Sequence, residues 1–341
     1  MRELTIPWLG RVPTSIVQPG TESLAGRAPR SLVEAAKQYR IYFADVPGIS
    51  SYVRHVVAQE RSTPALIFHL QAWHFIPILL SFWRPVYWYY QNRIPAHLPF
   101  HKAFVFRLLL RLVSGIIVQD QCCFAYFSRL FPRKTYGPLP WFVDSEFYAL
   151  PPRKVSTGII DLVGNQPFVL IPGDRGRDHA ILSHLARNLP FTYIRVSRSI
   201  SSRETDRLSS LPGVHVLRFI PYDDLLWLYR NATVVLNLVD DSSDSAGMTV
   251  LFEAMSCGAS IITPSGHSSA GYVESSRNSS VLLVPPSSSP SVWVDAFKSF
   301  LARSVLIDSE DPSSLLASVP FLNPPTYFRN LASIFYRPAT G

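Results

Sequence analysis

One carboxylate, Glu253, lies in the middle of an otherwise small and apolar run, SAGMTVLFEAMSCGAS, at residues 245–260. The run predicts a helix that begins near Gly247, with Glu253 nearly two turns inside it and its side chain inclined toward the N-terminal end. A carboxylate among apolar side chains has a large desolvation cost unless donors surround it, and the ribose of a nucleotide offers two hydroxyls. The alternative is a structural acid bonded to neighbouring backbone or to an arginine.

The predicted start of this helix suits an anion. The loop before it, DDSSDSAG at 240–247, contains only small and polar residues, and Gly247 lets a ligand approach the backbone closely. The N–H groups of Gly247, Met248 and Thr249 have no partner within the helix and lie at its positive dipole end. Because phosphates bind at such helix starts, the sequence predicts a phosphate site close to Glu253.

These residues need a scaffold, and the hydrophobic pattern predicts one. Short β-branched runs alternate with helical stretches along the chain. The expected strands are 65–70, 85–90, 114–119, 168–173, 191–197, 215–220, 233–239, 259–264 and 281–286, and the clearest helices are 178–189, 222–232 and 248–258. This alternation predicts an α/β protein with open, doubly wound parallel sheets covered on both faces. Ligands of such sheets bind beyond the carboxyl ends of the strands.

The composition narrows the class of protein. Hydrophobic residues make up 47% of the chain, which is ample for globular cores. The net charge of +8 indicates an anionic partner such as nucleotide phosphates or a membrane surface. Nucleic acid is not expected, because Lys and Arg are scattered and no recognised binding module is present. Three cysteines without metal or disulfide spacing, and an N-terminus without a signal-peptide pattern, predict a cytoplasmic protein.

One basic amphipathic segment points to a membrane surface. PFHKAFVFRLLLRLV at 99–113 predicts a helix rich in Phe and Leu, with Arg107 and Arg111 four residues apart on one face. Such a helix can lie on an anionic leaflet, and the aromatic cluster WRPVYWYYQN at 83–92 favours the same interpretation. The alternative is a buried connecting helix with one solvated edge. No window of 73–118 reaches the roughly 20 uncharged apolar residues that a spanning helix needs.

Four segments in the correct order make the sequence similar to family 4 glycosyltransferases, which have the GT-B fold of two Rossmann-like domains facing a cleft. The segments that resemble the family motifs are WFVDSEFY at 141–148, IPGDRGRDHAILSHLARNLP at 171–190, IPYDDLLWLYRNATVVLNL at 220–238 and GMTVLFEAMSCGASIITP at 247–264. The match covers residues 135–300 well. The first half resembles the family loosely, through IFHLQAWH at 67–74 and YYQN at 89–92.

The resemblance implies transfer of a sugar from a nucleotide-sugar donor to a glycan or lipid-linked acceptor, with retention and without a metal ion or cofactor. The family's helix glutamate that binds the donor ribose corresponds to Glu253. Its basic pair facing the diphosphate corresponds to Arg175 and Arg177, in the loop that begins at Gly173. Guanidinium groups there would stabilise the charge that builds on the leaving diphosphate. The alternatives are a solvated turn and a local ion pair of Arg177 with Asp178.

The length of 341 residues and the resemblance together predict the division of the chain. A stretch dense in Pro and Gly at 131–158 is expected to link two domains, with the boundary near residue 151. We expect an N-terminal Rossmann-like domain on the acceptor side at 1–150, and a nucleotide-sugar-binding Rossmann-like domain at 151–320. Residues 321–341 are expected to form a helix that returns to the first domain.

The sequence departs from the family pattern at two places. The second acid expected eight positions before the helix glutamate corresponds to Ser245, and a shift of one residue would let Asp244 serve near the donor sugar. The glycine-rich loop after the first strand is not evident, because 6–26 has scattered glycines and no clear strand before them. His69 and His74, at a strand end predicted to face the cleft, make no zinc site. Either of them, with His74 favoured, could hydrogen-bond the transferred sugar or the acceptor hydroxyl.

Other acids and aromatic residues have simpler interpretations. We expect Asp120 and Asp144 to be turn or strand-end acids, and Trp88 to lie in the core or face a membrane. Two other functions stay open. One is another GT-B enzyme such as a nucleotide-sugar epimerase, and the other is a degenerate, non-catalytic partner subunit. The favoured interpretation is a cytoplasmic sugar transferase, peripheral on the inner face of the membrane.

Overall fold

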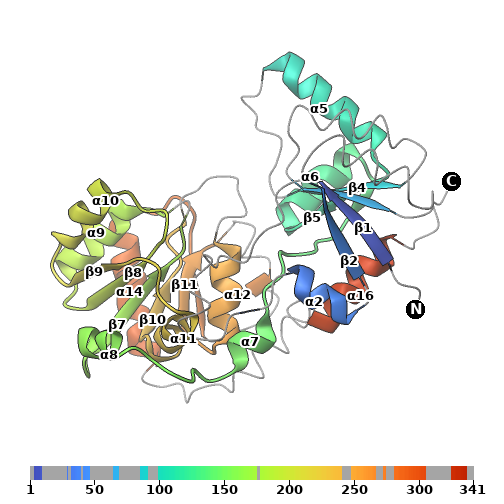
Figure 1. Cartoon of the computed structure of the whole chain (residues 1–341). Helices are drawn as coiled ribbons and strands as arrows, with labels where there is room; N and C mark the ends of the chain where they lie inside the picture. The colour runs from blue at the N-terminus through green and yellow to red at the C-terminus, as the bar shows by residue number, and fades with distance from the viewer. Residues whose placement is uncertain are drawn as a thin grey trace.

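The chain forms two lobes, each built on a parallel β-sheet (Figure 1). The computed structural model describes residues 4–9, 29, 32–39, 41–46, 64–68, 85–90, 99–174, 177–239, 247–265, 272–273, 280–304 and 324–335. Within these residues every strand pairs in parallel with its neighbours, and helices connect the strands. The predicted α/β class is therefore confirmed.

The N-terminal lobe contains a sheet in the order β2-β1-β3-β4-β5-β6. Its strands are β1 (Leu4–Leu9), β2 (Ile41–Val46), β3 (Ala65–Phe68), β4 (Val86–Tyr90), β5 (Gly115–Val118) and β6 (Thr135–Tyr136), and its helices are α2 (Leu32–Gln38), α5 (Phe100–Leu112) and α6 (Gln121–Leu130). The direction in which the chain adds strands reverses between β1 and β3. This order is that of a doubly wound sheet.

The C-terminal lobe contains a sheet in the order β12-β11-β10-β7-β8-β9. Its strands are β7 (Phe168–Pro172), β8 (Thr192–Val196), β9 (Val214–Leu217), β10 (Val234–Leu236), β11 (Ile261–Pro264) and β12 (Val281–Val284), and its helices include α9 (His179–Asn188), α10 (Ser202–Ser209), α11 (Tyr222–Asn231), α12 (Met248–Ser256) and α14 (Pro290–Ser304). The chain adds β8 and β9 on one side of β7 and then returns to add β10 on the other. The switch point of this sheet therefore lies between β7 and β10.

Every strand predicted from the hydrophobic runs is present, but the sequence reasoning missed β1, β2 and the two-residue β6. The strand LTIPWL runs through the start of the segment in which no strand was evident, so the scattered glycines do follow a strand. Pro7 lies in this strand opposite Ala44 of β2 and lacks the N–H group that a sheet ladder uses, a feature that makes a strand harder to recognise from sequence. β1 pairs with β3 only at Trp8 and Leu9, so Pro7 lies outside that ladder.

The aromatic cluster around β4 does not belong to a membrane belt. Tyr87, Trp88 and Tyr89 are each at most 5% exposed, because β4 is an internal strand between β3 and β5. Trp88 packs edge-on against Phe106 of α5 with ring centroids 5.0 Å apart. These three aromatic residues are core, and they lend no support to membrane binding. Among the described helices, none is long and apolar enough to cross a bilayer.

The segment between the sheets is more ordered than its Pro and Gly content suggested. It contains β6, α7 (Ser145–Ala149) and α8 (Thr157–Val163), and the boundary at residue 151 stays a prediction. Asp144 caps α7 by accepting from the Phe147 N–H, and Asp120, just after β5, caps α6 in the same way. These two acids are thus the turn and strand-end acids that the sequence predicted.

Two buried acids fasten this segment to the C-terminal lobe. Asp224, in the first turn of α11, accepts from both the N–H and the hydroxyl of Ser156 at 2.7 Å. Its neighbour Asp223 accepts from the Arg153 N–H at 3.1 Å. Both acids are 1% exposed, so these bonds offset the cost of burying their carboxylates.

The C-terminal helix α16 (Pro324–Phe335) packs on the N-terminal lobe, more than 180 residues after the last strand of its sheet. Tyr327, Phe328 and Leu331 join one apolar cluster with Tyr87 and Tyr89 of β4. The Tyr87 hydroxyl also donates to a carbonyl of α16, that of Ile334, at 3.3 Å. The N-terminal lobe therefore depends on residues from both ends of the chain, as the colours of Figure 1 show.

Replacing Leu331 with alanine should destabilise the N-terminal lobe by about 2–5 kcal/mol, because a 1% exposed leucine leaves a cavity in a packed core. Denaturant titration followed by circular dichroism would measure the loss. Ser333→Ala, on the exposed face of the same helix, is the matched control and should stay within about 0.5 kcal/mol of the unmodified protein. Equal stability of the two variants would contradict the packing described for α16.

Candidate functional site

The predicted site residues that the structure describes lie around the switch point of the second sheet. The loop after β7 carries Gly173 and Arg177, and the loop after β10 leads to Gly247 at the start of α12. The two loops are joined by an antiparallel bridge between Arg177 and Val239 and by the Asp178 N–H, which donates to the Leu238 carbonyl at 2.8 Å. Crevices at such points are where open α/β sheets bind ligands.

Glu253 is held by two tyrosine hydroxyls. Tyr148 of α7 donates to its Oε1 at 2.7 Å, and Tyr229 of α11 donates to its Oε2 at 2.8 Å. The sequence predicted donors for this acid, but the alternative partners it suggested were backbone and arginine. The tyrosines come from segments 105 and 24 residues away, so only the tertiary fold reveals them.

Burial and charge shift the pKa values of all three side chains in this group. Burial raises the pKa of Glu253, while the hydrogen bonds from Tyr148 and Tyr229 and the charges of Arg198 and Arg177 oppose that shift. Burial raises the pKa of both tyrosines, and the Glu253 charge adds to the shift. The tyrosines therefore stay neutral donors. Glu253 as a whole residue is half-buried, between the core and the surface of the lobe.

Arg177 lies over Gly173. Its Nε donates to the Pro172 carbonyl at 2.9 Å, and a Cβ built on Gly173 would approach its Nη2 to 2.2 Å. Gly173 also has a φ of +104°, which side chains rarely adopt. The glycine thus makes room for the guanidinium. Burial lowers the pKa of Arg177 to about 10, with the charges of Tyr229, Asp174 and Glu253 acting in the opposite direction, so it remains a cation near neutral pH.

A second arginine, which the sequence reasoning missed, holds the backbone of this loop through hydrogen bonds. Arg195 of β8 is 1% exposed, and its Nη1 donates to the carbonyls of Ile171, Gly173 and Val196 at 2.6–3.1 Å. Burial lowers its pKa to about 10, and the like charge of Arg177 adds to that effect. Carbonyl contacts of this kind fix the backbone path of the loop. A charged residue in a predicted strand is the signal that could have indicated it.

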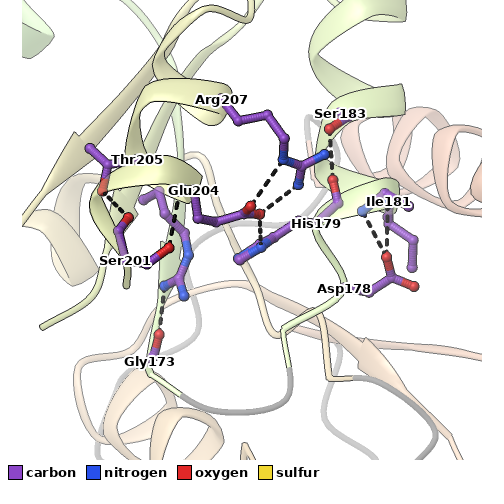
Figure 2. A network of polar contacts seen from close by, with 11 residues as sticks. Gly173, Asp178, His179, Ile181, Ser183, Ser201, Glu204, Thr205 and Arg207 are labelled. Atoms are coloured by element: carbon purple, nitrogen blue, oxygen red, sulfur yellow. Dashed lines mark hydrogen bonds and ion pairs between the residues drawn. The ribbon is translucent and has the colours of Figure 1, made fainter. Parts of the chain in front are cut away.

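Figure 2 shows the contacts that hold the adjoining helices in place. Asp178 caps α9 by accepting from the N–H groups of Ala180 and Ile181 at 2.8 and 3.1 Å. Its carboxylate therefore serves as a helix cap, whereas the sequence suggested an ion pair with Arg177. Glu204 of α10 lies between His179 Nδ1 and the Arg207 guanidinium, 2.5 Å from each. Burial lowers the pKa of His179, which fits a structural role at neutral pH.

Gly247 is required at the start of α12. It has a φ of +83°, and a Cβ at this position would lie 2.3 Å from Val239 Cγ2 and 2.6 Å from Asn237 Oδ1. Asn237, at the end of β10, donates through Nδ2 to the Gly247 carbonyl and to the Thr263 hydroxyl. No side chain caps this end of α12 in the described residues, which leaves its first-turn N–H groups for solvent or a ligand. Asn237 and Thr263 were not foreseen.

The other predicted residues are placed as follows. Met248 buries its side chain in the core at 1% exposure, so it can offer only its backbone, and Thr249 is half-buried beside it. Arg175, His74 and Asp244, as well as Ser245 and His69, lie outside the described residues. Among the residues that are described, no group of His, Cys, Asp and Glu side chains could hold a metal ion.

Solved structures share this architecture over nearly the whole chain. HepE of Anabaena, solved with UDP-glucose, is 18% identical with a TM-score of 0.66, covering 97% of this chain and 98% of its own. The α,α-trehalose 6-phosphate synthase of Burkholderia multivorans is 12% identical with a TM-score of 0.68, covering 98% of both chains. The UDP-GlcNAc 2-epimerase of Neisseria meningitidis is 15% identical with a TM-score of 0.50, covering 89% of this chain and 87% of its own.

These similarities and the two doubly wound sheets show that the chain has the GT-B fold. The predicted fold class is confirmed at this level. Neither the protein-family models nor the curated protein sequences give a match to the chain. Membership of family 4 within the fold therefore rests on the motifs alone.

Replacing Gly247 with alanine should destabilise the C-terminal lobe by about 1–3 kcal/mol, because the new Cβ meets Val239 and Asn237 and the φ is unfavourable. Gly158→Ala in α8 is the matched control, since a Cβ there has no atom within 4 Å. The free energy of unfolding of the control variant should be unchanged or higher by up to about 1 kcal/mol. Thermal unfolding of both variants measures the difference, and similar midpoints would contradict the close packing around Gly247.

Proposed function

We propose that this chain is a glycosyltransferase of the family 4 type that moves a sugar from a nucleotide-sugar donor to a glycan or lipid-linked acceptor. The observation that carries this proposal is the position of Glu253. It is a half-buried carboxylate held by Tyr148 and Tyr229, inside the helix that begins at the switch point. A carboxylate has about four lone-pair sites, and one hydrogen bond to each oxygen leaves capacity for ribose hydroxyls.

The donor diphosphate would lie between the first turn of α12 and the guanidinium of Arg177. Both are positive, the helix through its dipole and its uncapped N–H groups, the arginine through its charge. Arg177 and Glu253 come within range of each other's charge, because each affects the pKa of the other. A ligand with a phosphate next to a ribose matches this pairing of cation and acid.

The proposed reaction breaks the bond between the anomeric carbon and the diphosphate oxygen. The electron pair of that bond goes to the diphosphate. The acceptor hydroxyl bonds to the anomeric carbon, and its proton passes to the released diphosphate or to water. Arg177 would stabilise the leaving diphosphate more strongly as its charge grows, which lowers the barrier. Arg175, His74 and Asp244 stay proposals for the diphosphate, the acceptor side and the donor sugar, and retention without a metal ion or cofactor is expected from the resemblance.

The relatives of known structure support the donor class. HepE was solved with UDP and with UDP-glucose, and the Neisseria epimerase was solved with UDP-GlcNAc. At identities of 18% or less, structural similarity alone does not show that this chain binds the same ligands. They agree with what Glu253, Arg177 and the start of α12 could bind.

A thermal-shift screen with UDP-, GDP- and ADP-sugars tests the proposal, followed by calorimetry with the best donor. Glu253→Gln should weaken donor binding about 10- to 100-fold, because a charged hydrogen-bond acceptor is lost. Glu146→Gln is the matched control, since it changes an exposed acid on the same helix as Tyr148. Stabilisation by no nucleotide would reject the proposal in favour of a non-catalytic subunit. Turnover of the donor to an isomer without any acceptor would favour an epimerase.

Donor binding should weaken as pH falls, because protonated Glu253 loses its charge. The Tyr229 hydroxyl lowers the pKa of Glu253 against the effect of burial, so Tyr229→Phe should raise that pKa further. The acidic limb of the donor-binding profile should then move to higher pH. Calorimetry between about pH 5 and pH 8 measures the limb. Tyr126→Phe on α6 is the control, and an unshifted limb in Tyr229→Phe would show that Glu253 does not govern binding.

A further inference from the structure

Helix α5 exposes an apolar stripe that the proposed site does not use. Its exposed large side chains are Phe100 at 85%, Phe104 at 59%, Val105 at 50%, Leu108 at 47% and Leu112 at 48%. Four of them follow one another at intervals of four residues, so they form one line along the helix. Exposed apolar surface concentrated in this way marks an interaction site more often than isolated residues do.

The opposite face of α5 is firmly packed. Leu109 and Leu110 are at most 6% exposed and join a core cluster with Trp88 and Phe127. The C-terminal end is held by Lys134, whose Nζ donates to the carbonyls of Arg111 and Val113 at 2.7 and 2.9 Å. The helix is thus fixed to the lobe, and its apolar stripe faces outward. Figure 1 shows α5 at the outer edge of the N-terminal lobe, away from the C-terminal lobe.

Every charged residue on α5 is positive. Lys102, Arg107 and Arg111 are exposed on the helix, and the helix has no acidic residue. Arg133 is exposed next to Lys134, in the turn that contacts the C-terminal end of α5. These cations flank the stripe and carry long aliphatic stems that can lie along an apolar surface.

We propose that the outer face of α5 docks on an anionic lipid bilayer, with the apolar stripe entering the interface and the cations reaching the headgroups. A fluid bilayer accommodates a single convex helix, whereas a protein partner would need a matching groove. A second copy of the chain would bring two sets of like charges together, which opposes that pairing. The chain's net charge of +8 favours the same anionic partner. This docking does not depend on the proposed transferase activity.

Vesicle co-sedimentation of the full chain, without any nucleotide, tests the proposal. The protein should sediment with vesicles of phosphatidylcholine and phosphatidylglycerol, but at least about tenfold less with phosphatidylcholine alone, and high salt should weaken the binding. The double variant Phe104→Glu, Leu108→Glu should lose vesicle binding, and Arg107→Gln with Arg111→Gln should weaken it. Ile160→Glu is the matched control, because Ile160 is a comparably exposed side chain, at 44%, on α8 of the other lobe.

Several outcomes would overturn the proposal. One is a failure of the unmodified protein to bind the anionic vesicles, and another is equal binding to both kinds of vesicle. A third is binding that survives the double glutamate variant while circular dichroism shows that variant folded. A fourth is a dimer in light scattering that the same variant abolishes without any vesicle binding by the parent, which would assign the stripe to a second copy. If the double variant is unfolded, Phe100→Glu takes its place in the experiment, because Phe100 is the most exposed position of the stripe. The same loss of vesicle binding is expected.

Discussion

A carboxylate inside an apolar helix can persist only if hydrogen-bond donors reach it, and in this protein two tyrosines meet that requirement for Glu253. Tyr148 comes from α7, in the segment between the two sheets, and Tyr229 comes from α11. The acid therefore joins three separate segments, α7, α11 and α12, at one point inside the lobe. Because Glu253 as a residue is half-buried, this point lies between the core and the surface of the lobe.

The loop after β7 shows a comparable use of charge. Arg195 is buried against three backbone carbonyls, and Arg177 lies over Gly173 in the same loop. Asp174 joins this loop to the one after β8 by accepting from Ser197 and from the backbone of Arg198. Two cations that lie near each other weaken each other's charged form, and carbonyls and acids nearby offset that repulsion. The result is a fixed, positive loop at the switch point, which suits an anionic ligand.

The lobes are connected by more than the linking segment. α16 closes the core of the N-terminal lobe after the chain has completed the C-terminal one. The Tyr272 hydroxyl donates to the Gln119 carbonyl, at the carboxyl end of β5. Both contacts join residues far apart in sequence, and the Tyr272 bond is the one of the two that runs from one lobe to the other. Ligand sites of this fold class lie at the carboxyl ends of the strands, where Gln119 and the loop after β7 are found.

The sequence by itself determined the α/β class, because hydrophobic periodicity is local and each buried strand carries its own run of apolar residues. It also determined that a helix begins after Gly247 and contains Glu253, since a glycine before an apolar helical pattern is a local signal. It did not reveal β1, β2 or β6, because β1 contains a proline and β6 is only two residues long, so the local signals are weak and only the sheet pairing identifies these strands.

The tertiary structure alone decided which donors hold Glu253, where Arg195 is buried and which face of α5 is left outward. Tyr148 and Glu253 are 105 residues apart, and no local pattern joins them. The aromatic run at β4 looked interfacial, but burial inside the sheet made it core, while the neighbouring α5 kept its apolar stripe exposed. Long-range contacts of this kind depend on the order of the strands in space, which the chain specifies only after the whole sheet has formed.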